Sequence, residues 1–153
     1  MRRLTSVPRK GAGNARTPLE ASQQFFDKVL NGHQLDSIDD LVSDDYVELD
    51  PPPGQQPGRD GLRQALAAFN AAFPDNRWHI DQRIVEGDTI VTRFHWTGTQ
   101  TAEFRGVPAT NRSATVKGVV IDEFEGGLMA RSRILMDQFG LLQQLGLLPP
   151  MGG

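Results

Sequence analysis

Hydrophobic residues change their spacing about halfway along the chain. Up to Phe73 they recur at three- and four-residue intervals within three segments, as expected of helices that bury one face. From Trp78 onward they alternate with polar residues, as expected of strands. The pattern therefore predicts helices first and a series of long strands afterwards.

Local signals support three helices and one strand in the first half. Thr17-Pro18-Leu19-Glu20 has the spacing of a capping box, with proline at the first helical position, where its missing N–H costs nothing. Asp60 is placed to cap a later helix. Three consecutive prolines end the strand, because each removes a donor from the ladder. The predicted helices cover residues 18–30, 36–42 and 61–73, and the strand covers residues 45–50.

Four more strands are predicted in the second half, over residues 78–86, 89–100, 113–124 and 129–138. Short glycine-bearing links between the first two and between the last two are typical of antiparallel neighbours. The longer link over residues 101–112 is expected to pass over one end of the sheet. These elements predict an α+β fold, with about three N-terminal helices on one face of a strongly curved antiparallel or mixed sheet and a short C-terminal helical segment.

The composition narrows the class of protein. The chain has 153 residues, enough for one core, and contains no cysteine. Disulfides, thiolate catalysis and cysteine metal sites are therefore excluded, and a cytoplasmic location is favoured over secretion. No apolar stretch approaches the roughly 20 residues that cross a bilayer, so no membrane partner is expected.

Basic residues are concentrated at the start of the chain. Residues 1–16 contain five basic residues and no acidic residue. Because this segment lacks the apolar middle of a secretory signal, we expect a disordered basic leader over residues 1–16, followed by a single domain over residues 17–153. Acidic residues outnumber basic ones in the remainder, which argues against a nucleic-acid partner.

The most informative polar residue is Asp137, which lies inside the apolar run 134–139 of the last predicted strand. A buried carboxylate costs several kcal/mol unless it is paired or serves chemistry. Alternation places Arg93 and His95 on one face of their strand. If that face meets the face of Asp137, the three side chains converge in a dry hollow of the sheet, where an apolar environment would raise the pKa of the acid toward that of a general base. The alternative is a structural ion pair of Asp137 with Arg93 or Arg133.

Other residues are candidates for substrate binding. Asp50 could line the mouth of the site, or simply begin a turn, and Asp122 could point inward from its strand. Aromatic residues could form walls for a flat ring system, or belong to the core. These aromatic candidates are Tyr46, Phe69, Phe73, Trp78 and Trp96. No metal or other cofactor is expected, because the three histidines are widely spaced and no nucleotide-binding motif occurs.

Several short segments carry a resemblance to a known family. They are Phe73-Pro74-Asp75, Glu86-Gly87-Asp88, Thr97-Gly98-Thr99, Phe104-Arg105-Gly106-Val107-Pro108 and the ending from Asp137-Gln138-Phe139 to Leu145-Gly146. In this order and spacing, over residues 17–148, the chain resembles the SnoaL-like polyketide cyclase group of the cone-shaped nuclear-transport-factor-like superfamily.

The resemblance implies a role for Asp137, since cyclases of this group use an aspartate at the matching position as acid or base. The chain departs from the cyclase pattern in two ways. The cyclases add a histidine later in the sheet, whereas no histidine here lies beyond His95, and the residue before the prolines is Asp50 where histidine is common. Any catalytic imidazole is therefore expected from His95.

The first hypothesis is a cofactor-independent enzyme of secondary, antibiotic-type metabolism that acts on a hydrophobic polycyclic aromatic substrate rich in carbonyls. Asp137 would remove a proton beside a carbonyl, and Arg93 or His95 would stabilise the enolate. The alternatives are a cofactor-free hydroxylase, an epoxide hydrolase, and a binding or assembly module without chemistry. A homodimer through the exposed face of the sheet is also expected.

Overall fold

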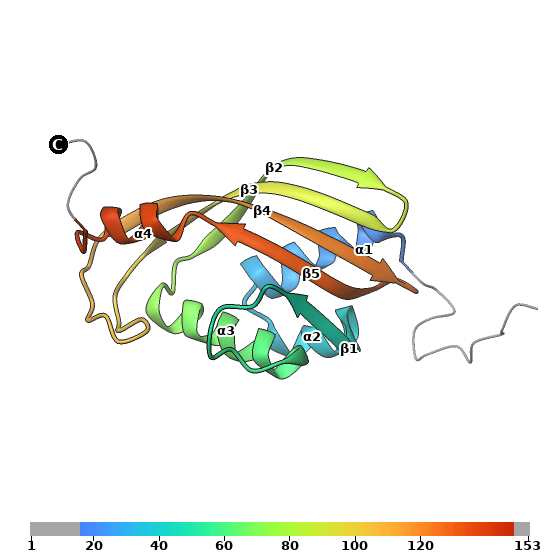
Figure 1. The fold of residues 1–153 in the computed structure, drawn as a ribbon, viewed down its shortest axis with the longest axis horizontal. Coiled ribbons are helices and arrows are strands. Elements are labelled where there is room, and N and C mark those ends of the chain that lie inside the picture. The colour runs from blue at the N-terminus through green and yellow to red at the C-terminus, as the bar shows by residue number, and fades with distance from the viewer. Residues whose placement is uncertain (1–15, 149–153) are drawn as a thin grey trace, which may run out of the picture.

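In the computed structural model, which describes residues 16–148, a five-stranded sheet arches over a layer of helices (Figure 1). The strand order is β1-β5-β4-β3-β2, with β1 parallel to β5 and every other pair antiparallel. The strands are β1 (Val42–Leu49), β2 (Arg77–Glu86), β3 (Thr89–Thr99), β4 (Ser113–Glu125) and β5 (Leu128–Met136). The helices are α1 (Pro18–Gln24), α2 (Ile38–Leu41), α3 (Gly58–Ala72) and α4 (Gln138–Gln144). The predicted α+β fold with a mixed sheet is confirmed.

Most of the predicted leader, residues 1–15, lies outside the described residues. Helices α1–α3 cover one face of the sheet, whereas no layer of helices from the described residues covers the opposite face (Figure 1). None of the helices between residues 16 and 148 combines the length and the apolar character needed to cross a bilayer.

The first helix begins as the sequence predicts and then changes its winding. Thr17 Oγ1 accepts a hydrogen bond from the Glu20 amide at 3.1 Å, and Glu20 Oε1 accepts one from the Thr17 amide at 2.9 Å, so the capping box is confirmed. From Phe25 to Asn31 the chain continues as a π-helix, in which each amide bonds to the carbonyl five residues earlier. The winding buries both Phe25 and Phe26 on the inner side.

The end of this helix is tied to the sheet by one side chain. Asn31 Nδ2 donates to the Trp78 carbonyl at 2.9 Å, and the Trp78 amide donates to Asn31 Oδ1 at 2.7 Å. The pair satisfies both backbone groups of Trp78, which is 6% exposed, at the start of edge strand β2. Asn31 therefore fixes where β2, and the indole of Trp78, lie relative to the helical layer.

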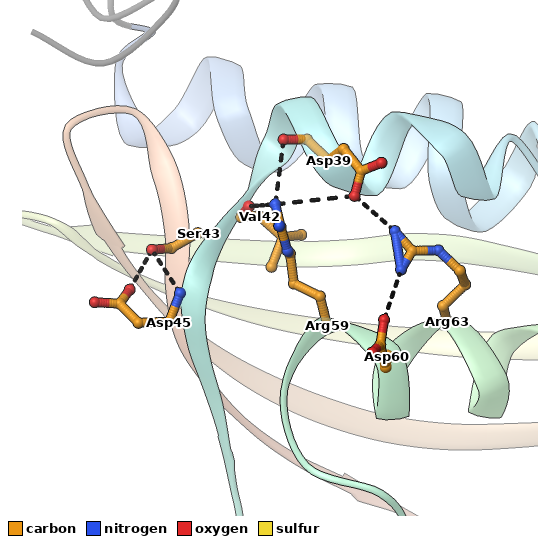
Figure 2. Close-up of polar contacts among 7 residues, drawn as sticks. All are labelled: Asp39, Val42, Ser43, Asp45, Arg59, Asp60 and Arg63. Atoms are coloured by element: carbon orange, nitrogen blue, oxygen red, sulfur yellow. Dashed lines mark hydrogen bonds and ion pairs between the residues drawn. The ribbon is translucent and has the colours of Figure 1, made fainter.

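Two arginines of α3 hold that helix against α2 (Figure 2). Arg63 Nη2 lies 2.7 Å from Asp39 Oδ1, and Arg59 Nη1 donates to the carbonyls of Asp39 and Val42, each at 3.4 Å. The prediction that Asp60 caps α3 is wrong, because the helix begins two residues earlier at Gly58 and Asp60 pairs instead with Arg63 at 3.4 Å. These contacts set the separation between α3 and the sheet at one end of the layer.

The inner face of the sheet carries most of the core. Trp96 and Phe73 are fully buried and pack edge to face, with ring centroids 4.9 Å apart. At Gly118 a Cβ would lie 2.5 Å from the Phe94 ring and 2.7 Å from the Leu135 carbonyl oxygen, so only glycine lets β4 pass this closely. A bulge in β2 between Ile80 and Gln82 shifts the register.

The Asn31 contact predicts a specific loss of stability. Replacing Asn31 with alanine leaves the amide and carbonyl of Trp78 without their partner, so we expect the free energy of unfolding to fall by about 2–3 kcal/mol. Urea denaturation measures this. Gln34→Ala, at an exposed position just after the same helix, is the matched control and should change stability by less than about 0.5 kcal/mol. Equal effects of the two substitutions would contradict the assignment.

Candidate active site

A cavity of about 340 Å³ lies between the helical layer and the inner face of the sheet. This volume is at the lower end of the range of roughly 300–1,000 Å³ typical of small-molecule sites. Its aromatic walls are formed by Phe25, Phe26, Tyr46, Phe69 and Trp78. Most of the remaining lining is aliphatic, from α3, β4 and β5, so the few polar groups that face it stand out chemically.

Asp122 is the most deeply buried acid of the cavity, at 2% exposure. It lies on β4 directly opposite Ser132 of β5, and the Ser132 hydroxyl hydrogen-bonds to Asp122 Oδ1 at 2.5 Å. Burial raises the pKa of the Asp122 carboxyl to about 7, because desolvation outweighs the opposing effects of the Ser132 hydrogen bond and the charge of Arg83. An acid with this pKa exchanges a proton readily near neutral pH.

Tyr46 extends this contact into a chain of hydroxyl groups. The Tyr46 side chain, 4% exposed on β1, hydrogen-bonds to Ser132. Desolvation by burial raises the pKa of the Tyr46 phenol well above its usual value, so the phenol keeps its proton. When Asp122 is ionised, the single Ser132 proton goes to the carboxylate, and the Tyr46 O–H then donates to Ser132. These hydroxyl groups stabilise the negative charge of the Asp122 carboxylate, which the apolar cavity disfavours.

A second carboxylate, Glu48, lines the same cavity two residues beyond Tyr46 on β1. Desolvation raises its pKa, and the hydrogen bond from Gln55 Nε2 to Glu48 Oε1, at 3.0 Å, opposes the rise. Sequence reasoning missed Glu48 and Ser132. The signal for Glu48 was available, because strict alternation puts residues 46 and 48 on one face of a strand.

Arg83 does not line the cavity, but its positive charge acts on Asp122. After the bulge in β2 it pairs in register with Thr92 of the inner face, and its guanidinium lies 5.3 Å from the centre of the Phe26 ring. Nη1 donates to Gln23 Oε1 at 2.5 Å, whereas Nε and Nη2 are buried without a hydrogen-bond partner among residues 16–148. The nearby positive charge lowers the pKa of Asp122 and so favours its ionised form.

The three residues predicted to be catalytic come together, but on the other face of the sheet. Asp137, Arg93 and His95 line an open hollow of about 460 Å³ on the uncovered face. His95 Nδ1 lies 2.9 Å from Asp81 Oδ1, and Arg93 Nη1 lies 3.9 Å from Asp81 Oδ2. The three residues therefore share one hollow, but this hollow is open and lies on the outer face instead of being dry and inside.

The prediction that Asp137 is a buried strand residue is wrong. Strand β5 ends at Met136, and Asp137 is an exposed residue that caps α4, with Oδ1 accepting the Gly140 amide at 2.9 Å. A carboxylate at a helix N-terminus has a structural reason to be there, so it needs no catalytic one. The catalytic roles of Asp137, Arg93 and His95 stay predictions, and the cavity favours a different acid.

The other predicted site residues divide between the cavity and the core. Asp122, Tyr46, Phe69 and Trp78 line the cavity, and Asp50 lies at its exposed rim, paired with Arg133 at 2.7 Å. Phe73 and Trp96 do not line it and are fully buried, which fits the core alternative. Between residues 16 and 148, no three His, Asp or Glu side chains are arranged to hold a metal ion.

Solved structures of the same fold include several proteins from Streptomyces. TsrD from Streptomyces laurentii is 27% identical, and the match covers 94% of this chain and all of TsrD with a TM-score of 0.73. IdmH from Streptomyces antibioticus, described as a candidate polyketide cyclase, is 24% identical over 86% of this chain and 99% of its own, with a TM-score of 0.74. AclR from Streptomyces galilaeus, described as a candidate hydroxylase, is 22% identical over 87% of each chain, with a TM-score of 0.76.

No curated protein matches the sequence. A family model described as SnoaL-like polyketide cyclase matches residues 20–145, which is most of the chain and includes every strand and helix that forms the cavity. The chain belongs to the SnoaL-like polyketide cyclase family.

Proposed function

We propose that this protein is a cofactor-independent enzyme of aromatic polyketide-type metabolism, in which Asp122 acts as the acid and base on a carbonyl-rich ring substrate. The observation that carries the proposal is a carboxyl with a pKa of about 7 facing an open, largely apolar cavity. A scaffold without chemistry would be expected to fill this space with side chains, so the open cavity favours a ligand-binding enzyme.

The proposed reaction begins with a ring substrate stacked among the aromatic walls. The Asp122 carboxylate removes a proton from the carbon beside a carbonyl, and the electron pair moves to the carbonyl oxygen to form an enolate. The enolate carbon attacks a second carbonyl of the same molecule, which forms the new C–C bond and an alkoxide. Asp122 returns its proton to that alkoxide, so one residue completes the cycle and no cofactor is consumed.

A hydroxylase is the second candidate. Within residues 16–148 the cavity lacks the histidine that cyclases of this group add to their aspartate. An electron-rich substrate ionised by Asp122 could therefore react directly with dissolved oxygen instead of closing a ring. Removing oxygen from the reaction distinguishes the two, because ring closure needs none.

Substituting the two competing aspartates tests the base directly. With 2-tetralone in deuterated water, NMR measures exchange of the acidic protons beside the carbonyl. We expect Asp122→Asn to slow the enzyme-dependent exchange by at least about a hundredfold, because the amide cannot accept the proton. Asp137→Asn should leave the rate within about a factor of two, since its carboxylate caps α4 outside the cavity. The reverse result would place the base in the outer hollow.

The protonation of Asp122 also predicts how stability depends on pH. A pKa raised to about 7 in the folded state means that folding favours the protonated form, so the stability that Asp122 contributes is full below pH 4 and is lost as the pH rises through 7. The asparagine of the Asp122→Asn variant does not titrate. The free energy of unfolding of this variant, minus that of the unmodified protein, should therefore rise by about 2–4 kcal/mol between pH 4 and 8. Urea denaturation across this range measures the difference, and a flat difference would remove Asp122 as the base.

We also propose that two copies associate through the uncovered face of the sheet. On that face Leu135 is 72% exposed and its cross-strand neighbour Val119 is 37% exposed, so two apolar side chains lie next to each other in contact with solvent. Light scattering at micromolar protein should give twice the monomer mass, and Leu135→Glu should lower it. A monomer mass for the unmodified protein would overturn this part of the proposal.

A further inference from the structure

One cation of the cavity has no part in the proposed chemistry. Arg105 lies in the loop between β3 and β4, which folds beneath the end of the sheet next to the last turn of α3 (Figure 1). Its guanidinium carbon is 4.9 Å from the centre of the Phe104 ring and 6.0 Å from that of the Phe69 ring. Both rings are buried, so the exposed Arg105 side chain lies against a packed aromatic surface at the cavity mouth.

The backbone at Arg105 is costly for this residue type. Phe104 and Val107 exchange two backbone hydrogen bonds of 2.9 Å each, and the two residues between them have positive φ, 50° at Arg105 and 83° at Gly106. A tight turn of this kind favours asparagine or glycine at its first central position, because other side chains are strained there. Strain kept at the rim of a cavity points to a use for the side chain rather than for the turn.

The charge of Arg105 also has no acidic partner within the described part of the chain. The neighbouring Glu103 uses its carboxylate to accept the Gly106 amide at 2.7 Å, and no acidic group of residues 16–148 lies within ion-pair distance of Arg105. At the same rim the Asp50 carboxylate forms an ion pair with Arg133. Of the basic residues in the described part of the chain, Arg105 alone lines the cavity.

We propose that Arg105 binds a carboxylate of the substrate, so that the natural substrate is an aromatic acid rather than a neutral ring. This deepens the proposed function and rests on it. The loop that carries Arg105 leads into the start of β4, and Asp122 lies near the end of that strand. The carboxylate of the substrate and its reacting ring carbon would therefore be held at opposite ends of the cavity. A planar guanidinium suits a carboxylate because it can donate two parallel hydrogen bonds.

Calorimetry with a matched pair of probes tests the proposal. 2-Naphthoate and 2-naphthamide have the same shape and differ in charge. We expect the unmodified protein to bind the acid about three- to tenfold more tightly than the amide, as for a partly exposed charge-assisted contact. Arg105→Asn should abolish this preference, and Arg105→Lys should retain part of it. Arg77→Asn, at an exposed arginine of β2 outside the cavity, is the matched control and should keep the full preference.

Stability separates loss of binding from loss of folding. Asparagine suits the turn, so Arg105→Asn should melt no lower than the unmodified protein while losing the preference for the acid. Equal binding of both probes by the unmodified protein, or an undiminished preference in Arg105→Asn, would overturn the role of Arg105 and leave the ring site intact. Failure of both probes to bind would overturn the role proposed for Arg105. If 2-tetralone exchange is lost in Asp122→Asn but not in Arg105→Asn, the proposed function stands even without that role.

Discussion

The contact between Asp122 and Ser132 is the constraint around which the site is organised. A carboxylate among apolar side chains is tolerated only if something compensates for lost hydration, and the pairing of β4 with β5 provides a hydroxyl at the right place. A slip of one residue between these strands would turn one of the two side chains to the outer face. The contact between Asp122 and Ser132 in the cavity therefore depends on the register between β4 and β5.

The helical layer keeps the space above this contact open. Asn31 ties the end of the first helix to β2, and Arg59 and Arg63 tie α3 to α2, so the helices are held by polar contacts at their ends. The apolar side chains between these ties need not close completely on the sheet, and the unfilled volume is the cavity. In this arrangement the core is fully packed around Trp96 and Phe73, and the cavity lies where the packing is less complete.

Much of the fold could be predicted from periodicity and local signals, because these depend on near neighbours in the chain. The capping box at Thr17 and the four long strands are examples. The site was harder, since alternation tells which residues share a face but not which face is covered. In the run around Asp137, Leu135 is exposed although its neighbours Ile134 and Met136 are half buried, so hydrophobicity alone misassigned the inner side. Asp122 was predicted only as a residue that could point inward from its strand, and its pairing with Ser132 joins two strands across a turn.

The π-helical winding of Phe25–Asn31 bears on how related cavities can diverge. A segment wound this way contains one more residue than an ordinary helix of the same length, and both phenylalanines that it turns inward border the cavity. Deleting a single amino acid there would let the segment rewind as an ordinary helix and would turn an aromatic ring out of the cavity wall, without replacing any residue of the sheet. Gain or loss of one codon at this point is thus a simple evolutionary route to a cavity of different shape without substitutions in the sheet.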